Sequence, residues 1–188
     1  MNYAALMKST FDSVAETPIH AWEDFAERCE VVSFNKNDTI KSANKIERYF
    51  SFILKGSIGV FLWKKNQWVC LDFAFDNHFF SDYFSILLKQ PSPLQIIALE
   101  NSEILRLSAD EYDRLTSEPD GKMIRLHATE MSYIQKQQQQ IELLTKSASE
   151  RYQLLLARFP DIHNRIAQNH IASYLGITPQ SLSRIRKT

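Results

Sequence analysis

The sequence contains little cysteine, little glycine and no long apolar segment. Among its 188 residues there are four glycines and two cysteines, Cys29 and Cys70. Two cysteines are too few for a disulfide scaffold or for an iron–sulfur cluster, which needs several closely spaced thiols. The longest mostly apolar run, residues 56–63, is far shorter than the roughly 18–20 residues of a membrane-spanning helix. The amino-terminal residues also lack a secretion signal, so we expect a cytoplasmic protein with no membrane partner.

What is present is typical of one folded domain or a tight pair of domains. Hydrophobic residues make up 44% of the chain and charged residues 23%, which supplies a core and excludes wholesale disorder. The net charge is zero but unevenly distributed. Residues 146–188 contain seven basic and two acidic residues, so this segment carries +5 and the remainder −5. Apart from a chance imbalance, this asymmetry favours a polyanionic partner for the carboxy-terminal segment.

Short β-rich runs occupy residues 31–107. They are RYFSFIL, SIGVFLW, WVCLDFAF, PLQIIAL and EILRLS, and turn signals separate them. Many short strands at this spacing predict an antiparallel barrel or jelly roll. Asn37, Asn66 and Asn77 stand where turns are expected, because asparagine tolerates the left-handed backbone conformation better than most residues.

Helical patterns flank this region and make the predicted fold class α+β. Apolar residues 21–26 recur at helical spacing and predict a short amino-terminal helix. Ser108 and Glu111 form a capping-box pattern at the start of a second short helix. After an expected break at 117–121, residues 122–146 contain neither glycine nor proline and predict one long helix.

In the long helix, mostly apolar residues repeat at spacings of three and four, a pattern typical of a coiled-coil seam. We expect a homodimer through this helix, with an amide as one polar layer of the seam. The alternative is that these side chains pack on the barrel of the same subunit, and one helix can do both. The predicted dimerisation residues are Met131, Ile134, Gln138 and Ile141.

The most specific pattern is the last 21 residues, QNHIASYLGITPQSLSRIRKT. Residues 171–175 place apolar groups on one face of a first helix, and Gly176 suits the left-handed residue that ends it. Thr178 is a hydroxyl cap, and Pro179 fits the first position of a second helix. This order is typical of a helix-turn-helix.

The outward face of the second helix carries suitable side chains for reading DNA. Helical spacing places Gln180, Arg184 and Lys187 on that face. Glutamine pairs with adenine and arginine with guanine in the major groove, whereas neighbouring hydroxyl and basic groups suit phosphate. The full set of predicted DNA-binding residues is Ser173, Thr178, Gln180, Ser181, Arg184, Arg186 and Lys187.

The order of barrel, long helix and helix-turn-helix resembles the Crp/Fnr family of bacterial transcription regulators. YFSFILKG, FFSD and ALENSE, in that order along the barrel, add to the resemblance, which covers nearly the whole chain. It implies a cyclic-nucleotide-binding-like sensor at 1–120, a dimerisation helix at 121–146 and a DNA-binding domain at 147–188. It also implies a homodimer that binds palindromic double-stranded DNA, with RNA polymerase as a further candidate partner.

The resemblance also bears on the effector. Members that bind cyclic AMP carry Gly-Glu and, about ten positions later, arginine followed by a small hydroxyl residue. Here the matching positions read Ser81-Asp82 and Pro91-Ser92-Pro93, without arginine. A cyclic phosphate would lose its cationic partner and meet Asp82 uncompensated, so we do not expect cyclic AMP to bind. Ser81, Asp82 and Ser92 are candidates to line a pocket for an unknown small-molecule effector; a closed barrel without ligand is the alternative.

Other classes of function receive little support. The five histidines show no spacing typical of haem or metal ligands, and we predict no metal and no cofactor. A cupin-like enzyme would need several histidines inside the barrel, where the sequence places His78 alone, so we predict no enzymatic activity. The chain stops at Thr188 without the β-hairpin wing of many family members, and we expect weaker DNA binding. The alternative function is a degenerate sensor or protein-interaction module without specific DNA binding.

Overall fold

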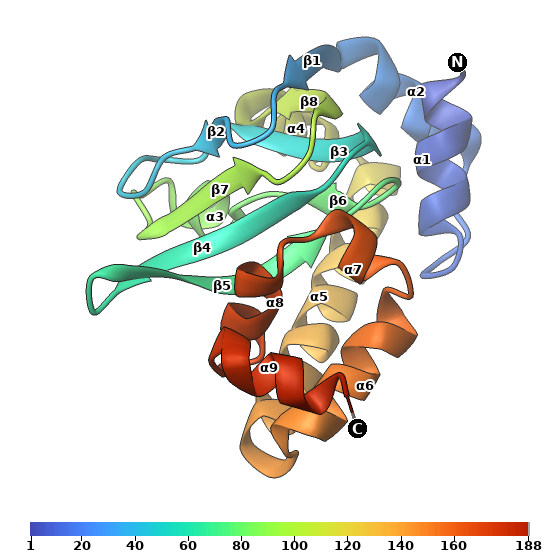
Figure 1. Ribbon diagram of the computed structural model, residues 1–188. Coiled ribbons are helices and arrows are strands. Elements are labelled where there is room, and N and C mark those ends of the chain that lie inside the picture. Colours follow the sequence, from blue (N-terminus) through green and yellow to red (C-terminus); the bar gives the residue numbers. More distant parts are fainter. Residues whose placement is uncertain (188) are drawn as a thin grey trace.

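The computed structural model describes residues 1–187, in which a two-sheet barrel is followed by a group of helices (Figure 1). Thr188, the last residue of the predicted DNA-binding domain, lies outside the described residues. Each sheet has four antiparallel strands, in the orders β1-β8-β3-β6 and β2-β7-β4-β5. The strands are Glu30–Phe34 (β1), Thr39–Lys41 (β2), Tyr49–Lys55 (β3), Ile58–Lys64 (β4), Gln67–Ala74 (β5), Phe79–Phe80 (β6), Leu94–Ala98 (β7) and Ser102–Ser108 (β8). The predicted antiparallel sheets are confirmed.

Helices cover one end of the barrel and continue beyond its other end. They are Tyr3–Phe11 (α1), Ile19–Arg28 (α2), Tyr83–Leu88 (α3), Ala109–Leu115 (α4), Pro119–Thr145 (α5), Ala148–Arg158 (α6), Ile162–Arg165 (α7), Gln168–Tyr174 (α8) and Pro179–Ile185 (α9). The sequence predicts α2 but not α1, whose Phe11 packs against Trp22 of α2 with ring centroids 5.2 Å apart. Both aromatic rings are buried, so the two helices close this end of the barrel.

The turn and cap signals of the sequence are mostly confirmed. Asn37, Asn66 and Asn77 have positive φ angles of 75°, 60° and 63°. The Ser108 hydroxyl accepts a hydrogen bond from the N–H of Glu111 at 3.2 Å and begins α4. The second half of the predicted capping box is absent, because the Glu111 carboxylate pairs instead with the guanidinium groups of Arg114 and Arg28.

The long helix α5 begins earlier than the sequence predicts. Pro119 occupies its first turn, where the missing proline N–H costs nothing, so the expected break at 117–121 is wrong in its second half. Gly121 is inside the helix because the chain approaches closely there: a Cβ atom would lie 2.0 Å from the carbonyl oxygen of Leu115. Glycine therefore permits the contact between α4 and α5.

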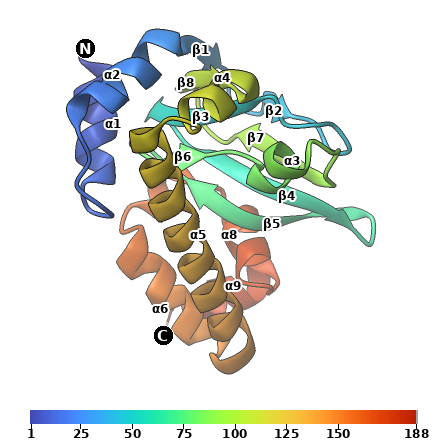
Figure 2. The ribbon, with the colours of Figure 1, turned by 180° about the vertical axis from the view of Figure 1, so that it is seen from behind.

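Helices α6 to α9, here called the carboxy-terminal unit, share a core with the barrel. Buried Phe61, Cys70 and Phe73 of the barrel belong to one apolar cluster with side chains of the unit. Those of the unit are Tyr152, Leu155, Ile162, Ile166, Ile171, Ala172, Leu175 and Leu182. Figure 2 shows α5 descending from the barrel in front of α8 and α9. The unit therefore packs directly on the barrel.

Candidate functional site

Helices α8 and α9 are joined by the turn that the sequence predicts. Gly176 has a φ of 67°, and the N–H of Ile177 donates to the carbonyl of Ala172 at 3.0 Å, which closes the end of α8. The Thr178 hydroxyl accepts from the N–H of Ser181 at 3.2 Å and caps α9, with Pro179 as the first helical residue. These local signals position α9 against α8.

The two faces of α9 differ in burial. Leu182 is fully buried against α8, whereas Gln180 and Arg184 on the other face are exposed. Lys187, predicted on the same face, is exposed but lies two residues beyond the end of α9. Arg186 and Thr178 are also exposed, and Ser181 is half-buried. The helix is therefore anchored through one face and exposes a polar face with one basic residue, and two more basic residues follow its end.

Ser173 does not lie with the other predicted DNA-binding residues. Its hydroxyl accepts a hydrogen bond from the backbone N–H of Cys70 in β5 at 2.9 Å, which places the half-buried side chain against the barrel. Sequence spacing puts Ser173 on α8, but only the packing of α8 on β5 shows which way it faces. In this arrangement Ser173 joins the two parts of the chain instead of facing outward.

Helix α5 has an unusual apolar stripe on the side away from the barrel. Ile134 and Ile141 of the predicted seam are exposed, Gln138 is exposed and Met131 is half-buried. The stripe also contains apolar side chains that the sequence prediction missed: Leu126, Tyr133 and Leu144, the last 78% exposed. The other side of α5 contacts its own chain, where Gln139 donates to the carbonyl of Leu71 at 3.1 Å.

The predicted effector residues lie in and beside the segment that joins β6 to β7 through α3. Asp82 caps α3, with its carboxylate accepting from the N–H of Ser85 at 3.2 Å. The Lys41 ammonium of β2 lies 2.7 Å from Asp82 Oδ2 and 2.8 Å from Ser92 Oγ. Ser92 also hydrogen-bonds Asp82, and the Lys41 and Asp82 side chains are 3% and 0% exposed. These three residues form a closed, buried charge cluster, here called the cassette cluster.

Glu47 extends the cassette cluster. One carboxylate oxygen accepts from the N–H groups of Arg48 and Tyr49 at 2.9 and 3.1 Å, and the other accepts from the N–H of Asp82 at 3.4 Å. Burial raises the pKa of Glu47, and these backbone donors offset part of the rise. The cluster thus satisfies two buried carboxylates with one ammonium group and several backbone donors.

Asp82 and Ser92, predicted to line an effector pocket, are buried and bonded to Lys41 and to each other, so the structure gives this prediction no support. Ser81 is half-buried beside them. The sequence argument assumed that the Asp82 carboxylate has no cationic partner, but Lys41 forms an ion pair with it. Lys41 was missed because it lies 41 residues away in the chain and nothing in its neighbourhood marks it.

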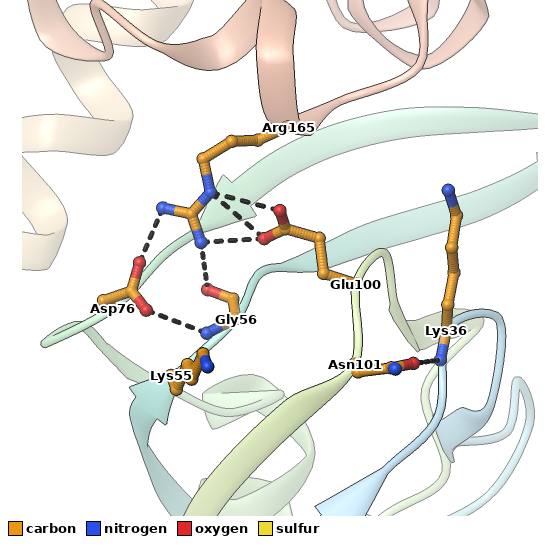
Figure 3. Close-up of a pocket in the computed structure, with 7 residues that line it drawn as sticks. All are labelled: Lys36, Lys55, Gly56, Asp76, Glu100, Asn101 and Arg165. Atoms are coloured by element: carbon orange, nitrogen blue, oxygen red, sulfur yellow. Dashed lines mark hydrogen bonds and ion pairs between the residues drawn. The ribbon is translucent and has the colours of Figure 1, made fainter.

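A second charge cluster joins the carboxy-terminal unit to three turns of the barrel (Figure 3). Arg165 of α7 lies 2.6 Å from Asp76 and 2.7 Å from Glu100, and it donates to the carbonyl oxygen of Gly56 at 2.9 Å. Burial raises the pKa of Asp76, but hydrogen bonds from the Gly56 N–H and from Arg165 outweigh that effect and hold the pKa below its usual value. This group, the junction cluster, opens onto a pocket of about 400 Å³.

Two further features of the described residues concern other classes of site. Within residues 1–187, no helix combines the length and apolar character needed to cross a membrane. Nor do three or more His, Cys, Asp or Glu side chains in that range gather closely enough to hold a metal ion. The candidate sites are therefore the α9 face, the α5 stripe and the two charge clusters.

Comparison with known proteins agrees with this architecture. Residues 31–118 match the family model of the cyclic nucleotide-binding domain. No curated protein matches the sequence. The fold is similar to that of FixK2 from Bradyrhizobium japonicum, with 15% identity, a TM-score of 0.70, and coverage of 85% of this chain and 83% of that one.

Two other structures are similar over most of their length. The c-di-GMP-responsive global regulator CLP of Xanthomonas campestris has 11% identity and a TM-score of 0.68, with 90% of each chain covered. The catabolite activator protein of Thermus thermophilus has 16% identity and a TM-score of 0.58, with 95% of this chain and 84% of that one covered. At these identities the shared property is the fold. Residues 31–118 thus resemble a cyclic nucleotide-binding domain, and the fold of most of the chain is similar to the folds of these three solved structures.

Proposed function

We propose that this protein is a homodimeric transcription regulator of the Crp/Fnr type that binds palindromic DNA through α8 and α9. The observation that carries the proposal is the two-sided character of α9. Leu182 anchors one face, the other face exposes Gln180 and Arg184, and Lys187 is exposed just beyond the end of the helix. Arginine and glutamine form paired hydrogen bonds with guanine and adenine edges, and lysine suits phosphate.

Charge supports the same conclusion. The segment 146–188, which contains α9, carries +5 in a chain of zero net charge. DNA binding draws much of its free energy from neutralised phosphates, so a cationic unit on an acidic remainder favours one orientation on the duplex. Arg186 and Thr178, both exposed beside the ends of α9, are suited to phosphate contacts.

The α5 stripe supports a dimer. Tyr133, Ile141 and Leu144 are more than half exposed on one side of a helix whose other side contacts the barrel. A second copy of the same helix would bury these side chains in a two-fold interface. Two α9 helices in one dimer would then read two half-sites about one DNA turn apart.

The cassette cluster supports a sensor that does not bind cyclic AMP. In this segment the charge of Asp82 is already neutralised by Lys41, and Ser92 is bonded to both residues. A cyclic phosphate would have to separate a buried ion pair, and removing one partner of such a pair typically costs about 3–5 kcal/mol. An effector, if the protein has one, binds elsewhere.

The DNA-binding proposal is tested by selecting duplexes from fragmented genomic DNA with the wild-type protein and with Arg184→Ala. The wild type should enrich a two-fold symmetric site. Arg184→Ala should bind that site about 10- to 100-fold more weakly, because one bidentate base contact contributes about 1–3 kcal/mol. Lys89→Ala, on the barrel and away from α9, is the matched control for losing one exposed positive charge.

Equal affinity of wild type and Arg184→Ala for the enriched site would contradict base reading by α9. Enrichment of no site, with the dimer intact, would favour a protein-interaction module instead.

The dimer proposal is tested separately by sedimentation equilibrium of Ile141→Glu. Because Ile141 is 57% exposed in the single chain, the substitution should leave the subunit folded and shift the dimer toward monomer. Ser132→Glu, exposed on the opposite side of α5, is the control and should remain dimeric. An unchanged mass for Ile141→Glu would place the interface elsewhere.

A further inference from the structure

Most of the side-chain polar groups that remain unbonded in the pocket beside the junction cluster are hydrogen-bond donors. Its carboxylates are already used: Asp76 accepts from the Gly56 N–H at 2.8 Å and pairs with Arg165, and both oxygens of Glu100 accept from Arg165. The carbonyl of Gly56 also accepts from Arg165. The two carboxylates of the pocket and the Gly56 carbonyl are therefore already bonded within the protein.

The unused polar groups of the pocket are donors. Lys36 and Lys55 line it, both are exposed, and neither ammonium group has an ion-pair or hydrogen-bond partner among residues 1–187. Asn101 accepts from the backbone N–H of Lys36 at 2.9 Å through its side-chain oxygen, which leaves its amide N–H₂ group as a further donor. In Figure 3, Lys36 and Lys55 lie on opposite sides of the junction cluster, with Lys55 beside Gly56 and Asp76. Two ammonium groups and an amide are thus available on either side of a fixed guanidinium.

The positive charge at this pocket affects the pKa of a neighbouring histidine. His170 of α8 has a lowered pKa, chiefly because of burial and in addition because of the nearby Lys36 ammonium. Counted over its lining, the pocket has three basic residues, Lys36, Lys55 and Arg165, against two carboxylates. An acceptor-rich, negatively charged molecule complements such a surface, whereas a cation does not.

We propose that this pocket binds a small polyanion, a molecule with two or more phosphate or carboxylate groups. Lys36 and Lys55 contact separate acidic groups of the ligand, and Asn101 donates a third hydrogen bond. The volume of about 400 Å³ is within the range of small-molecule sites. The site is distinct from the cassette cluster, which is closed, and it does not depend on DNA binding or dimerisation.

The position of the pocket gives a bound anion access to both parts of the chain. Lys36 lies in the turn before β2 and Lys55 ends β3, whereas Arg165 belongs to the carboxy-terminal unit. A ligand there adds contacts across the same junction that Arg165 bridges. If the DNA-binding proposal holds, occupancy of this pocket would bias the position of the unit that carries α9.

Isothermal titration calorimetry of the full chain with inorganic pyrophosphate and with citrate, at constant ionic strength, tests the site. We expect saturable binding of at least one probe with one site per chain. Lys36→Gln and Lys55→Gln should each weaken it about ten-fold, the effect of losing one charge-assisted hydrogen bond. Lys64→Gln, which removes an exposed lysine from the β4–β5 hairpin, is the matched control.

Three outcomes would overturn the proposal. They are the absence of saturable binding of both probes at millimolar concentration, binding that the Lys36→Gln/Lys55→Gln double variant retains in full, and equal weakening by Lys64→Gln. Preference for pyrophosphate over citrate, or the reverse, identifies the acidic group that the pocket takes. Because the measurement contains no DNA, a failure here leaves the DNA-binding proposal unaffected, and the converse also holds.

Discussion

The cassette cluster and the junction cluster contain the same kinds of charged group in opposite surroundings. In the cassette cluster the side chains of Lys41 and Asp82 are 3% and 0% exposed. In the junction cluster the side chains of Arg165, Asp76 and Glu100 are 27%, 36% and 30% exposed. Water therefore reaches the side chains of the second cluster and hardly reaches those of the first. Burial, and not residue type, therefore decides whether a charge cluster is part of the core or able to exchange partners.

The free energies behind this contrast have different origins. In a buried ion pair, the attraction between the two charges is offset by the free energy that each group lost when it left water, so the net contribution to stability is small. Removal of one partner is costly, because it leaves the other charge buried and unpaired. A half-exposed ion pair contributes less attraction, and removal of one partner costs less, because water solvates the charge that remains. The cassette cluster thus fills the segment where the family resemblance suggested an effector site. The junction cluster, in contrast, has an open pocket next to its own residues.

The largest expected effect comes from breaking the cassette cluster. Lys41→Met leaves the Asp82 carboxylate buried without a cation and should lower the free energy of unfolding by about 3–5 kcal/mol. Urea unfolding measures the loss. The control is Lys89→Met, whose ion pair with Asp113 is exposed and whose loss should cost no more than about 1 kcal/mol. Similar costs for the two variants would show that burial does not separate the clusters.

A smaller effect is expected at the junction cluster. Arg165→Met removes two half-exposed ion pairs and one hydrogen bond and should cost about 1–2 kcal/mol at neutral pH. Because the folded-state pKa of Asp76 is lowered, its contribution is present above its ordinary pKa and is lost as the pH falls below about 4. Urea unfolding at neutral pH and near pH 3 should therefore show the difference between wild type and Arg165→Met narrowing in acid. A difference that stays constant would argue against the Arg165–Asp76 interaction.

The smallest expected effect is a change in the pKa of His170, which tests the positive potential of the junction pocket. Lys36→Gln removes the second cause of the lowered pKa of His170 and leaves the first, burial, unchanged. The pKa of His170 should therefore rise slightly but stay below its usual value, as a titration followed by NMR would show. Lys64→Gln should not change it. A fall in the His170 pKa on losing Lys36 would contradict the positive potential inferred for the pocket.

The parts of the molecule that the sequence predicted correctly depend on local signals. Gly176, Thr178 and Pro179 specify the end of α8 and the start of α9 within a few residues, and the structure has the turn as predicted. The strands follow from β-rich runs between turn signals, and Asn66 and Asn77 adopt the expected backbone conformation. Each of these features is decided by neighbours in the chain.

The surroundings that the sequence did not predict involve contacts between distant segments. Asp82 and Ser92 resemble pocket residues until β2 brings Lys41 between them, 41 and 51 residues away along the chain. Ser173 lies on the predicted helix but bonds to Cys70, 103 residues away. No periodicity or motif reports such a partner, because the backbone topology chooses it.

The sequence by itself determined the elements of this protein: antiparallel strands, a long helix, a capped helix pair and a cationic end. These follow from propensities and spacings that act over a few residues. Only the tertiary structure decided which charges are buried and which remain open. The same ammonium group is part of the core at Lys41 and exposed to solvent at Lys36, because the desolvation of a side chain depends on the whole fold around it.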